Sequence, residues 1–155
     1  MVTIREAGDE DVIRISALWG QFMAYNAAFN DSFNVRKQAA SIFAREMTER
    51  KQNPDCRLAV AEFDGDLIGF CYSYISLKPK YFKLGRFGFI GDLYVKPKHR
   101  GQGIGRRLVD DAMNFFNKRK IKQIELLVAV ENTDTIKFWK ALGFDHLLTW
   151  MYKRT

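Results

Sequence analysis

The feature that most constrains the fold is a stretch that ends a strand, crosses a glycine-rich loop and opens a helix. It runs from Ile90 to Leu108 and reads IGDLYVKPKHRGQGIGRRL. A β-branched and aromatic run ends at Val95, Pro97 lies in a short basic loop, and glycines then alternate at the start of a helix. Alternating glycines remove Cβ atoms that would hold a ligand away from the backbone, so several N–H groups can point at one anion beside a helix N-terminus. The stretch therefore predicts a strand, loop and helix that bind a pyrophosphate.

The glycine spacing separates this loop from two other nucleotide-binding loops. The dinucleotide fingerprint is G-x-G-x-x-G with an acidic residue about twenty positions further on, whereas here the glycines are Gly101, Gly103 and Gly105. No Walker A run, G-x-x-x-x-G-K-[ST], occurs in the chain. The pattern Arg100-x-x-Gly103-x-Gly105 after a hydrophobic strand instead resembles the acetyl-CoA signature of the GNAT superfamily of N-acetyltransferases.

A second segment strengthens this resemblance. Residues 128–132 and 136–144 read as a strand, an Asn, an amphipathic helix and a closing Gly-Phe pair, in the order and at the spacing of the family's next block. The resemblance covers residues 56–152 and is weakest before them. It implies an α/β (α+β) fold in one N-acetyltransferase domain, residues 1–155. A central mixed, mostly antiparallel sheet would carry helices on both faces.

Length and composition agree with one packed domain. The chain has 155 residues, of which 47% are hydrophobic, and it contains thirteen Phe, which suits a packed interior. No apolar run approaches the roughly eighteen residues of a membrane span, and the N-terminus lacks the apolar core of a secretory signal. We therefore expect a cytoplasmic protein without a membrane partner.

The two cysteines and two histidines do not form a metal-binding pattern. Cys56 and Cys71 lie in predicted strands without C-x-x-C spacing, and His99 and His146 belong to no ligand cluster. Free cysteines in strands usually behave as small core hydrophobes, and neither has an adjacent base that would make it a nucleophile. We expect no metal and two reduced thiols.

The net charge of +7 is concentrated in one part of the chain. Between Lys78 and Arg107, nine basic residues accompany a single acid, Asp92. Such a surface attracts anions, and a cofactor with a pyrophosphate and a 3′-phosphate explains both the charge and the glycines. Nucleic acid would explain the charge alone, and no recognition helix, zinc ligands or stacking motif is present. A basic nucleic-acid-binding module is therefore the weaker alternative.

Hydrophobic periodicity predicts the order of the elements. We expect strands at 3–6, 57–63, 67–77, 87–95, 123–130 and 145–152, and helices after residue 11, over 35–51, after residue 103 and between 132 and 143. Asp64-Gly65 predicts a hairpin turn, Asn53-Pro54 ends the second helix, and Gly143 ends the last one.

The resemblance implies direct transfer of an acetyl group from acetyl-CoA to a primary amine in a ternary complex. The acceptor would be a small molecule or an amino group of a peptide or protein, walled by the first two helices and the loop 77–86. Such a transfer needs a neutral amine, a donor for the tetrahedral oxyanion and a proton for the departing thiolate. Asp92, the one acid of the basic stretch, is the first candidate for the base and Glu125 is the second. For Asp92 the alternative is a structural carboxylate that holds a backbone N–H or pairs with a Lys. Glu125 shares a strand face with Leu127 and Ala129, and the sequence does not say which face that is.

The resemblance also assigns the cofactor contacts. Backbone at the end of the central strand would align the pantetheine arm and supply the oxyanion donor. The expected cofactor-binding residues are Leu93, Tyr94, Val95, Arg100, Gly101, Gln102, Gly103, Ile104, Gly105, Arg106, Asn132 and Trp139. For Asn132 the alternative is a plain helix N-cap, and for Arg100 it is a solvated loop charge.

Trp139 departs from the family pattern. The usual proton donor to the thiolate is a Tyr after the Phe of the second block, and here Trp139 follows Phe138. An indole N–H is not a useful acid, so we expect Trp139 to pack against cofactor or core. Solvent or another phenol, Tyr81, Tyr94 or Tyr152, would supply the proton. The departure leaves open a catalytically idle acyl-CoA-binding or sensor domain, and a homodimer is compatible with the pattern.

Overall fold

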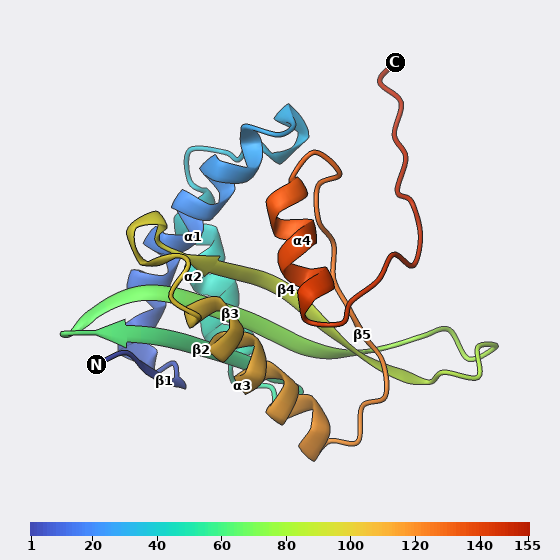
Figure 1. Cartoon of the computed structure of the whole chain (residues 1–155), viewed down its shortest axis with the longest axis horizontal. Coiled ribbons are helices and arrows are strands. Elements are labelled where there is room, and N and C mark those ends of the chain that lie inside the picture. Colours follow the sequence, from blue (N-terminus) through green and yellow to red (C-terminus); the bar gives the residue numbers. More distant parts are fainter.

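The computed structural model describes residues 1–155 around one five-stranded sheet (Figure 1). The strands are β1 (Thr3–Glu6), β2 (Cys56–Phe63), β3 (Asp66–Leu77), β4 (Arg86–Val95) and β5 (Ile124–Glu125). They lie side by side in chain order, the first four antiparallel and β5 parallel to β4. The mixed, mostly antiparallel sheet that the sequence predicted is confirmed.

Four helices cover the two faces of this sheet. They are α1 (Val12–Ala27), α2 (Ala39–Arg50), α3 (Ile104–Lys118) and α4 (Thr133–Ala141). The first two pack on one face, whereas α3 packs on the other together with Trp139 of α4. Short 3-10 turns lie at η1 (Asp9–Asp11), η2 (Asp31–Phe33) and η3 (Pro97–His99).

β3 is the central strand because both of its faces are buried. Side chains alternate along a strand, so Phe70 and Tyr72 join the core under α1 and α2, and Cys71 joins the core under α3. Gly69 lets the neighbouring β4 approach, since a Cβ there would lie 2.7 Å from the Tyr94 carbonyl oxygen. One apolar core thus lies on each face of the sheet.

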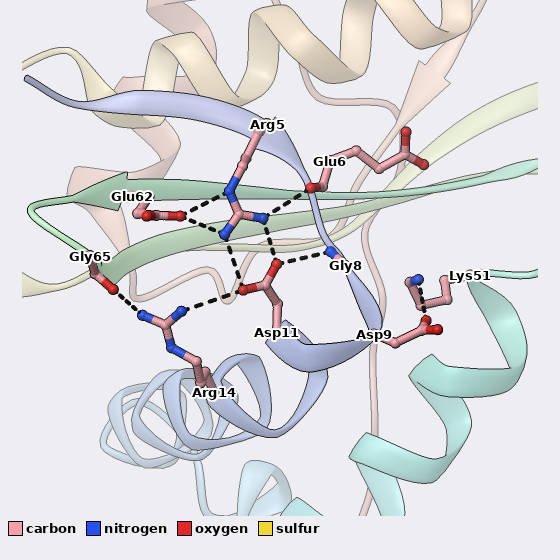
Figure 2. Close-up of polar contacts among 9 residues, drawn as sticks. All are labelled: Arg5, Glu6, Gly8, Asp9, Asp11, Arg14, Lys51, Glu62 and Gly65. Atoms are coloured by element: carbon pink, nitrogen blue, oxygen red, sulfur yellow. Dashed lines mark hydrogen bonds and ion pairs between the residues drawn. The ribbon is translucent and has the colours of Figure 1, made fainter.

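Charged side chains fasten the β1 end of the sheet (Figure 2). The Asp11 side chain is fully buried. It accepts hydrogen bonds from Arg5 Nη1 at 2.5 Å, Arg5 Nη2 at 3.1 Å and the Gly8 N–H at 2.9 Å, and Arg5 Nε donates to Glu62 at 2.8 Å. The hydrogen bonds from Arg5 hold the pKa of Asp11 below its usual range. This Arg5–Asp11–Glu62 network joins β1, η1 and β2.

Two strand predictions do not match the structure. The strand expected at 123–130 pairs only at Ile124–Glu125, because β4 bends away from it beyond Phe89. The strand expected at 145–152 is absent, because the chain there runs extended with no neighbouring sheet edge to pair with.

The second helix also differs from its prediction. It begins at Ala39 and not at residue 35, because the Ala39 N–H closes a turn onto the Arg36 carbonyl. None of the helices is both long and apolar enough to cross a membrane.

Candidate active site

The outer edge of β4 lacks a strand partner over its second half. β5 pairs with β4 only at Gly88 and Phe89, whereas β3 follows β4 as far as Val95. The register between β3 and β4 shifts at Gly91, which is left unpaired between Ile90 and Asp92. A bulge of this kind bends and twists its strand. The predicted residues Leu93, Tyr94 and Val95 therefore lie along an open edge, where backbone groups that point away from β3 are free for a ligand.

Asp92 follows the bulge and faces the same side as Tyr72, its partner across the strands. Gly91 leaves room for the aromatic rings there, since a Cβ at this position would lie 3.1 Å from Tyr72 Cδ1 and 3.5 Å from Tyr74 Cε1. The Asp92 carboxylate is partly buried and has no hydrogen-bonding or ion-pair partner in the protein. Burial raises its pKa to about 6, against the opposing effect of the nearby Arg50 charge.

Glu125, the second candidate base, differs from Asp92 because its carboxylate has partners. Its Oε1 lies 2.8 Å from Lys78 Nζ and accepts a hydrogen bond of 2.8 Å from Gln123 Nε2. A carboxylate held by a lysine and an amide already has its lone pairs engaged. The structure thus gives the two candidate carboxylates different surroundings, because Glu125 has partners and Asp92 has none.

An aromatic row borders Asp92, consisting of Tyr72, Tyr74 and Phe89. The ring centroids of Tyr72 and Tyr74 lie 5.4 Å apart, as do those of Tyr74 and Phe89. Arg50 of α2 lies over the Tyr72 ring with its Cζ 5.8 Å from the centroid. Sequence reasoning missed this row. The signal was Tyr72-x-Tyr74 in the alternation of a strand, but the face on which it lies depends on the packing of α1 and α2.

The glycine loop has an open backbone at the start of α3. Gly103 is the N-cap residue, with φ of 75° and no side-chain cap, and Gly101 has φ of 74°. Glycine is the residue that adopts this conformation without steric strain. The first N–H groups of a helix have no partners within it, so they are available here to an anion. Among the predicted residues, Gln102 and Arg106 are exposed, whereas the Ile104 side chain is buried and anchors the helix.

Arg100 lies at the end of β4. Its Nε donates to the Val95 carbonyl oxygen at 2.8 Å. Its guanidinium carbon lies 5.0 Å from the centre of the Tyr25 ring and 5.5 Å from that of the Tyr94 ring. The side chain is exposed, and it lies against α1 beside the glycine loop.

Asn132 is buried at the N-terminus of α4. Its Oδ1 accepts hydrogen bonds from the Thr135 N–H at 3.3 Å and from the Tyr25 hydroxyl at 3.5 Å. The helix-capping role is present, and the side-chain amide Nδ2 has no hydrogen-bond acceptor in the protein. Because Tyr25 contacts both Arg100 and Asn132, the structure brings these two predicted residues together beside the open edge of β4.

Trp139 is buried in the core under α3. Its ring packs edge-to-face against Phe138 at 5.0 Å and Phe144 at 5.1 Å. Gly143, with φ of 90°, ends α4 and turns Phe144 back onto this cluster. The packing predicted for Trp139 is therefore present.

Neither cysteine is placed to act as a nucleophile. Cys71 is buried, and burial raises the pKa of its thiol to about 12, so little thiolate forms at neutral pH. Cys56 Sγ lies 3.6 Å from the Tyr72 hydroxyl, and both thiols are free. No group of three or more His, Cys, Asp or Glu side chains is arranged to hold a metal ion.

The fold is that of a known family of acetyltransferases. The acetyltransferase (GNAT) family model matches residues 22–144, and the chain belongs to that family. The match includes the open edge of β4, the glycine loop and the start of α4.

Several individual proteins are similar over most of the chain. An uncharacterized N-acetyltransferase of Methanocaldococcus jannaschii is 30% identical over 147 residues, which cover 92% of this chain and 60% of that protein. A mycothiol acetyltransferase of Acidothermus cellulolyticus is 29% identical over 153 residues, or 93% of this chain and 44% of that protein. The chain thus spans about half the length of these relatives.

A solved structure shows the same fold. A predicted acetyltransferase of Clostridium acetobutylicum, with acetyl-CoA, superposes with a TM-score of 0.82 at 20% identity and covers 99% of this chain and 96% of its own. The α+β architecture of a GNAT protein is thereby confirmed.

Proposed function

We propose that this chain transfers an acetyl group from acetyl-CoA to a primary amine, and that Asp92 accepts the proton of that amine. The observation that carries the proposal is a partly buried carboxylate without a partner, placed just after the bulge that opens β4. The family match and the names of the relatives support the reaction class.

The residues beside Asp92 suit acetyl-CoA chemically. Backbone groups of residues 93–95 would hold the pantetheine arm as an added strand, and the N–H groups of residues 101–106 would hold the pyrophosphate. The free Nδ2 of Asn132 would donate to the same arm, with Arg100 next to it. When bound, this group supplies the activated acetyl thioester.

Asp92 has the properties that a base for an amine requires. With a pKa of about 6 it is mainly ionised at neutral pH, and a base poised near the working pH transfers protons most effectively. Tyr74 and Phe89 are the half-buried rings of the aromatic row, and their faces would hold an ammonium until Asp92 removes its proton. An N–H on the open edge of β4 would then stabilise the oxyanion that forms as the neutral amine attacks the thioester.

For the departing thiolate we propose protonation by solvent. Trp139 is buried, and its indole is not an acid. Tyr94 lies on β4, as Asp92 does, but its hydroxyl donates a hydrogen bond of 3.2 Å to Gln21 Oε1. Tyr81 is 83% exposed in the loop after β3, and the Tyr152 hydroxyl contacts Asn30. A thiol with a pKa of about 8.5 is a good leaving group without a dedicated acid.

The decisive experiment compares Asp92→Asn with Glu125→Gln as a matched control. With a panel of primary amines and thiol release as the assay, Asp92→Asn should lower kcat/KM at neutral pH by about 10²- to 10⁴-fold, with acetyl-CoA affinity unchanged. Raising the pH should partly restore the rate, because an amine with a pKa near about 10 is then neutral without help. Glu125→Gln should stay near the wild-type rate.

Three outcomes would contradict the proposal. Superimposable pH profiles for wild type and Asp92→Asn would make Asp92 structural. Acetyl-CoA binding without turnover of any amine would favour an idle acyl-CoA-binding module. Nucleic-acid binding with a steep salt dependence, and no stabilisation by CoA, would favour a basic nucleic-acid-binding module.

A further inference from the structure

Arg50, the last residue of α2, carries a charge that the proposed transfer does not use. Its guanidinium lies over the Tyr72 ring, with the Cζ atom 5.8 Å from the centroid. Arg50 forms one ion pair, in which Nη2 lies 3.2 Å from Glu46 Oε2, and both side chains are 49% exposed. An exposed pair four residues apart on one helix is weak. Most of the five guanidinium donors are therefore available to a ligand.

Arg50 and Asp92 border the same two tyrosines of the aromatic row. Arg50 lies over Tyr72, and Tyr72 is the cross-strand partner of Asp92. Tyr74 lies beside Tyr72, with ring centroids 5.4 Å apart. Burial raises the pKa of the Tyr74 hydroxyl, the Arg50 charge lowers it and the Asp92 charge raises it. One half-buried ring thus lies within electrostatic reach of both charges.

The charges of Arg50 and Asp92 are opposite, but they do not pair with each other. Arg50 contacts Glu46, whereas Asp92 has no ion-pair partner. A molecule with both an ammonium and an anionic group would satisfy both charges, with its ammonium at Asp92 and its anion at Arg50. A plain alkylammonium or a diamine would instead meet the unfavourable charge of Arg50.

The anionic group that fits Arg50 is a carboxylate. The planar guanidinium matches the geometry of a carboxylate and of a phosphate, so the number of charges decides between them. Lys51, the other basic residue at this end of α2, is engaged by Asp9, with Nζ 2.6 Å from Oδ1. Glu46 already offsets part of the Arg50 charge. One partly neutralised cation balances a single negative charge and not the nearly two of a phosphate monoester.

We propose that the acceptor is a small amino acid, with its carboxylate bound by Arg50 and its amino group at Asp92. This inference rests on the proposed function, because it names the acceptor of that same transfer. The amine nitrogen bonds to the acetyl carbon as the carbon–sulfur bond breaks. Of the two protons that the ammonium loses, one goes to Asp92 and the other, through solvent, to the thiolate. Arg50 contacts the carboxylate and not the reacting atoms, so it determines specificity.

The first test compares four acids, glycine, β-alanine, γ-aminobutyrate and δ-aminovalerate, each with its own carboxamide. The two members of a pair have the same length and differ in the charge that Arg50 recognises. For the best acid, wild-type kcat/KM should exceed that of its carboxamide by about 10- to 100-fold, mostly through KM, because hydrogen bonds between charged groups contribute about that factor. The series also measures the separation of amine and carboxylate that the site accepts.

Variants of α2 then assign the preference to one side chain. Arg50→Gln should bring the ratio of acid to carboxamide close to one. Arg45→Gln is the matched control, because Arg45 is exposed on the same helix and its loss removes the same charge, yet the ratio should stay as in wild type. Arg50→Glu should reverse the preference, so that a diamine of matching length becomes a better acceptor than the acid. Thermal unfolding checks that each variant is folded.

Failure of this inference and failure of the proposed function give different results. Carboxamides and plain amines that react as fast as the acids, or a ratio that Arg50→Gln leaves unchanged, would overturn the amino-acid acceptor while the acetyl transfer stands. If no amine reacts, calorimetric titration of the acids into CoA-saturated protein still decides. The best acid should then bind wild type about tenfold or more tightly than its carboxamide does, and Arg50→Gln should remove the difference. Equal binding of acid and carboxamide by wild type would overturn the proposal.

Discussion

The β1 edge and the β4 edge of the sheet differ in how completely their charged and backbone polar groups are paired. On the β1 side, the Arg5–Asp11–Glu62 network joins a strand, a turn and a second strand, and Arg57 adds hydrogen bonds of 2.8 and 2.9 Å to Asp111 of α3. On the β4 side, a bulge opens the strand edge and Asp92 has no partner. The difference indicates that the β1 edge stabilises the fold, whereas the β4 edge retains unpaired groups, which we propose bind the ligand.

The pKa values of Asp11 and Asp92 are shifted in opposite directions, in line with this contrast. Hydrogen bonds from Arg5 lower the pKa of Asp11, whereas burial raises that of Asp92 to about 6. Asp11 therefore stabilises the fold above its unfolded pKa of about 4, and this contribution is lost as the pH falls through its folded pKa. Asp92 has the opposite sign: ionising it in the folded state costs stability, and that cost grows as the pH rises from about 4 to 6.

Removing Asp11 should produce the largest loss of stability. Asp11→Ala leaves Arg5 and the Gly8 N–H without their acceptor, so the free energy of unfolding should fall by about 3 kcal/mol. Asp9→Ala is the control, because Asp9 is 77% exposed with Lys51 as its partner and should change stability by less than about 0.5 kcal/mol. Urea unfolding measures both. Equal losses in the two variants would show that the network contributes no more stability than the exposed Asp9–Lys51 ion pair.

Gly103→Glu should remove stabilisation by CoA. Ligand at a hundred times its Kd adds about 2.7 kcal/mol to the wild type, and a negative side chain at the start of α3 should abolish this gain. Gly65→Glu is a matched control at the β2–β3 turn, with φ of 82° and the same open surroundings. It should destabilise the free protein by a similar strain and keep the gain. A CoA-induced shift that survives Gly103→Glu would place the phosphates elsewhere.

Asp92→Asn should raise stability at neutral pH. Because the neutral amide carries no desolvation cost of charge, we expect a gain of about 1–2 kcal/mol above pH 6. The gain should shrink to nothing below about pH 4, where the wild-type carboxyl is protonated in both states. Unfolding free energies across this pH range measure it, with Asp110→Asn, exposed on α3, as the control. A variant less stable than wild type at neutral pH would mean that Asp92 has a structural partner.

The smallest effect on activity is expected from Trp139→Phe. Because we assign Trp139 to packing, kcat should change by less than about threefold, while stability falls by about 1 kcal/mol for the lost contacts. Removing a positioned general acid would instead cost about 10²- to 10⁴-fold. Steady-state kinetics with thermal unfolding distinguish these results. A loss of that size in a folded, acetyl-CoA-binding variant would mean that Trp139 takes part in proton transfer.

Sequence was sufficient for features that depend on neighbours along the chain. The alternation of apolar residues, the hairpin at Asp64-Gly65 and the glycine loop before α3 are local, because periodicity and backbone freedom are properties of consecutive residues. Asn132 before a helix and the packing of Trp139 follow from the same kind of pattern. These features fixed the order of strands and helices and the family.

Only the tertiary structure decided the features that depend on which residues meet across the fold. Lys78 forms an ion pair with Glu125, whereas Asp92 has no such partner. Tyr25 contacts both Arg100 and Asn132. The aromatic row forms where β3 and β4 face α1 and α2. The strand expected at 145–152 failed for the same reason, since a strand requires a partner edge as well as a pattern. Whether a charge is paired, or a strand finds its neighbour, is set by contacts between residues far apart in sequence, and one chain read along its length does not contain that information.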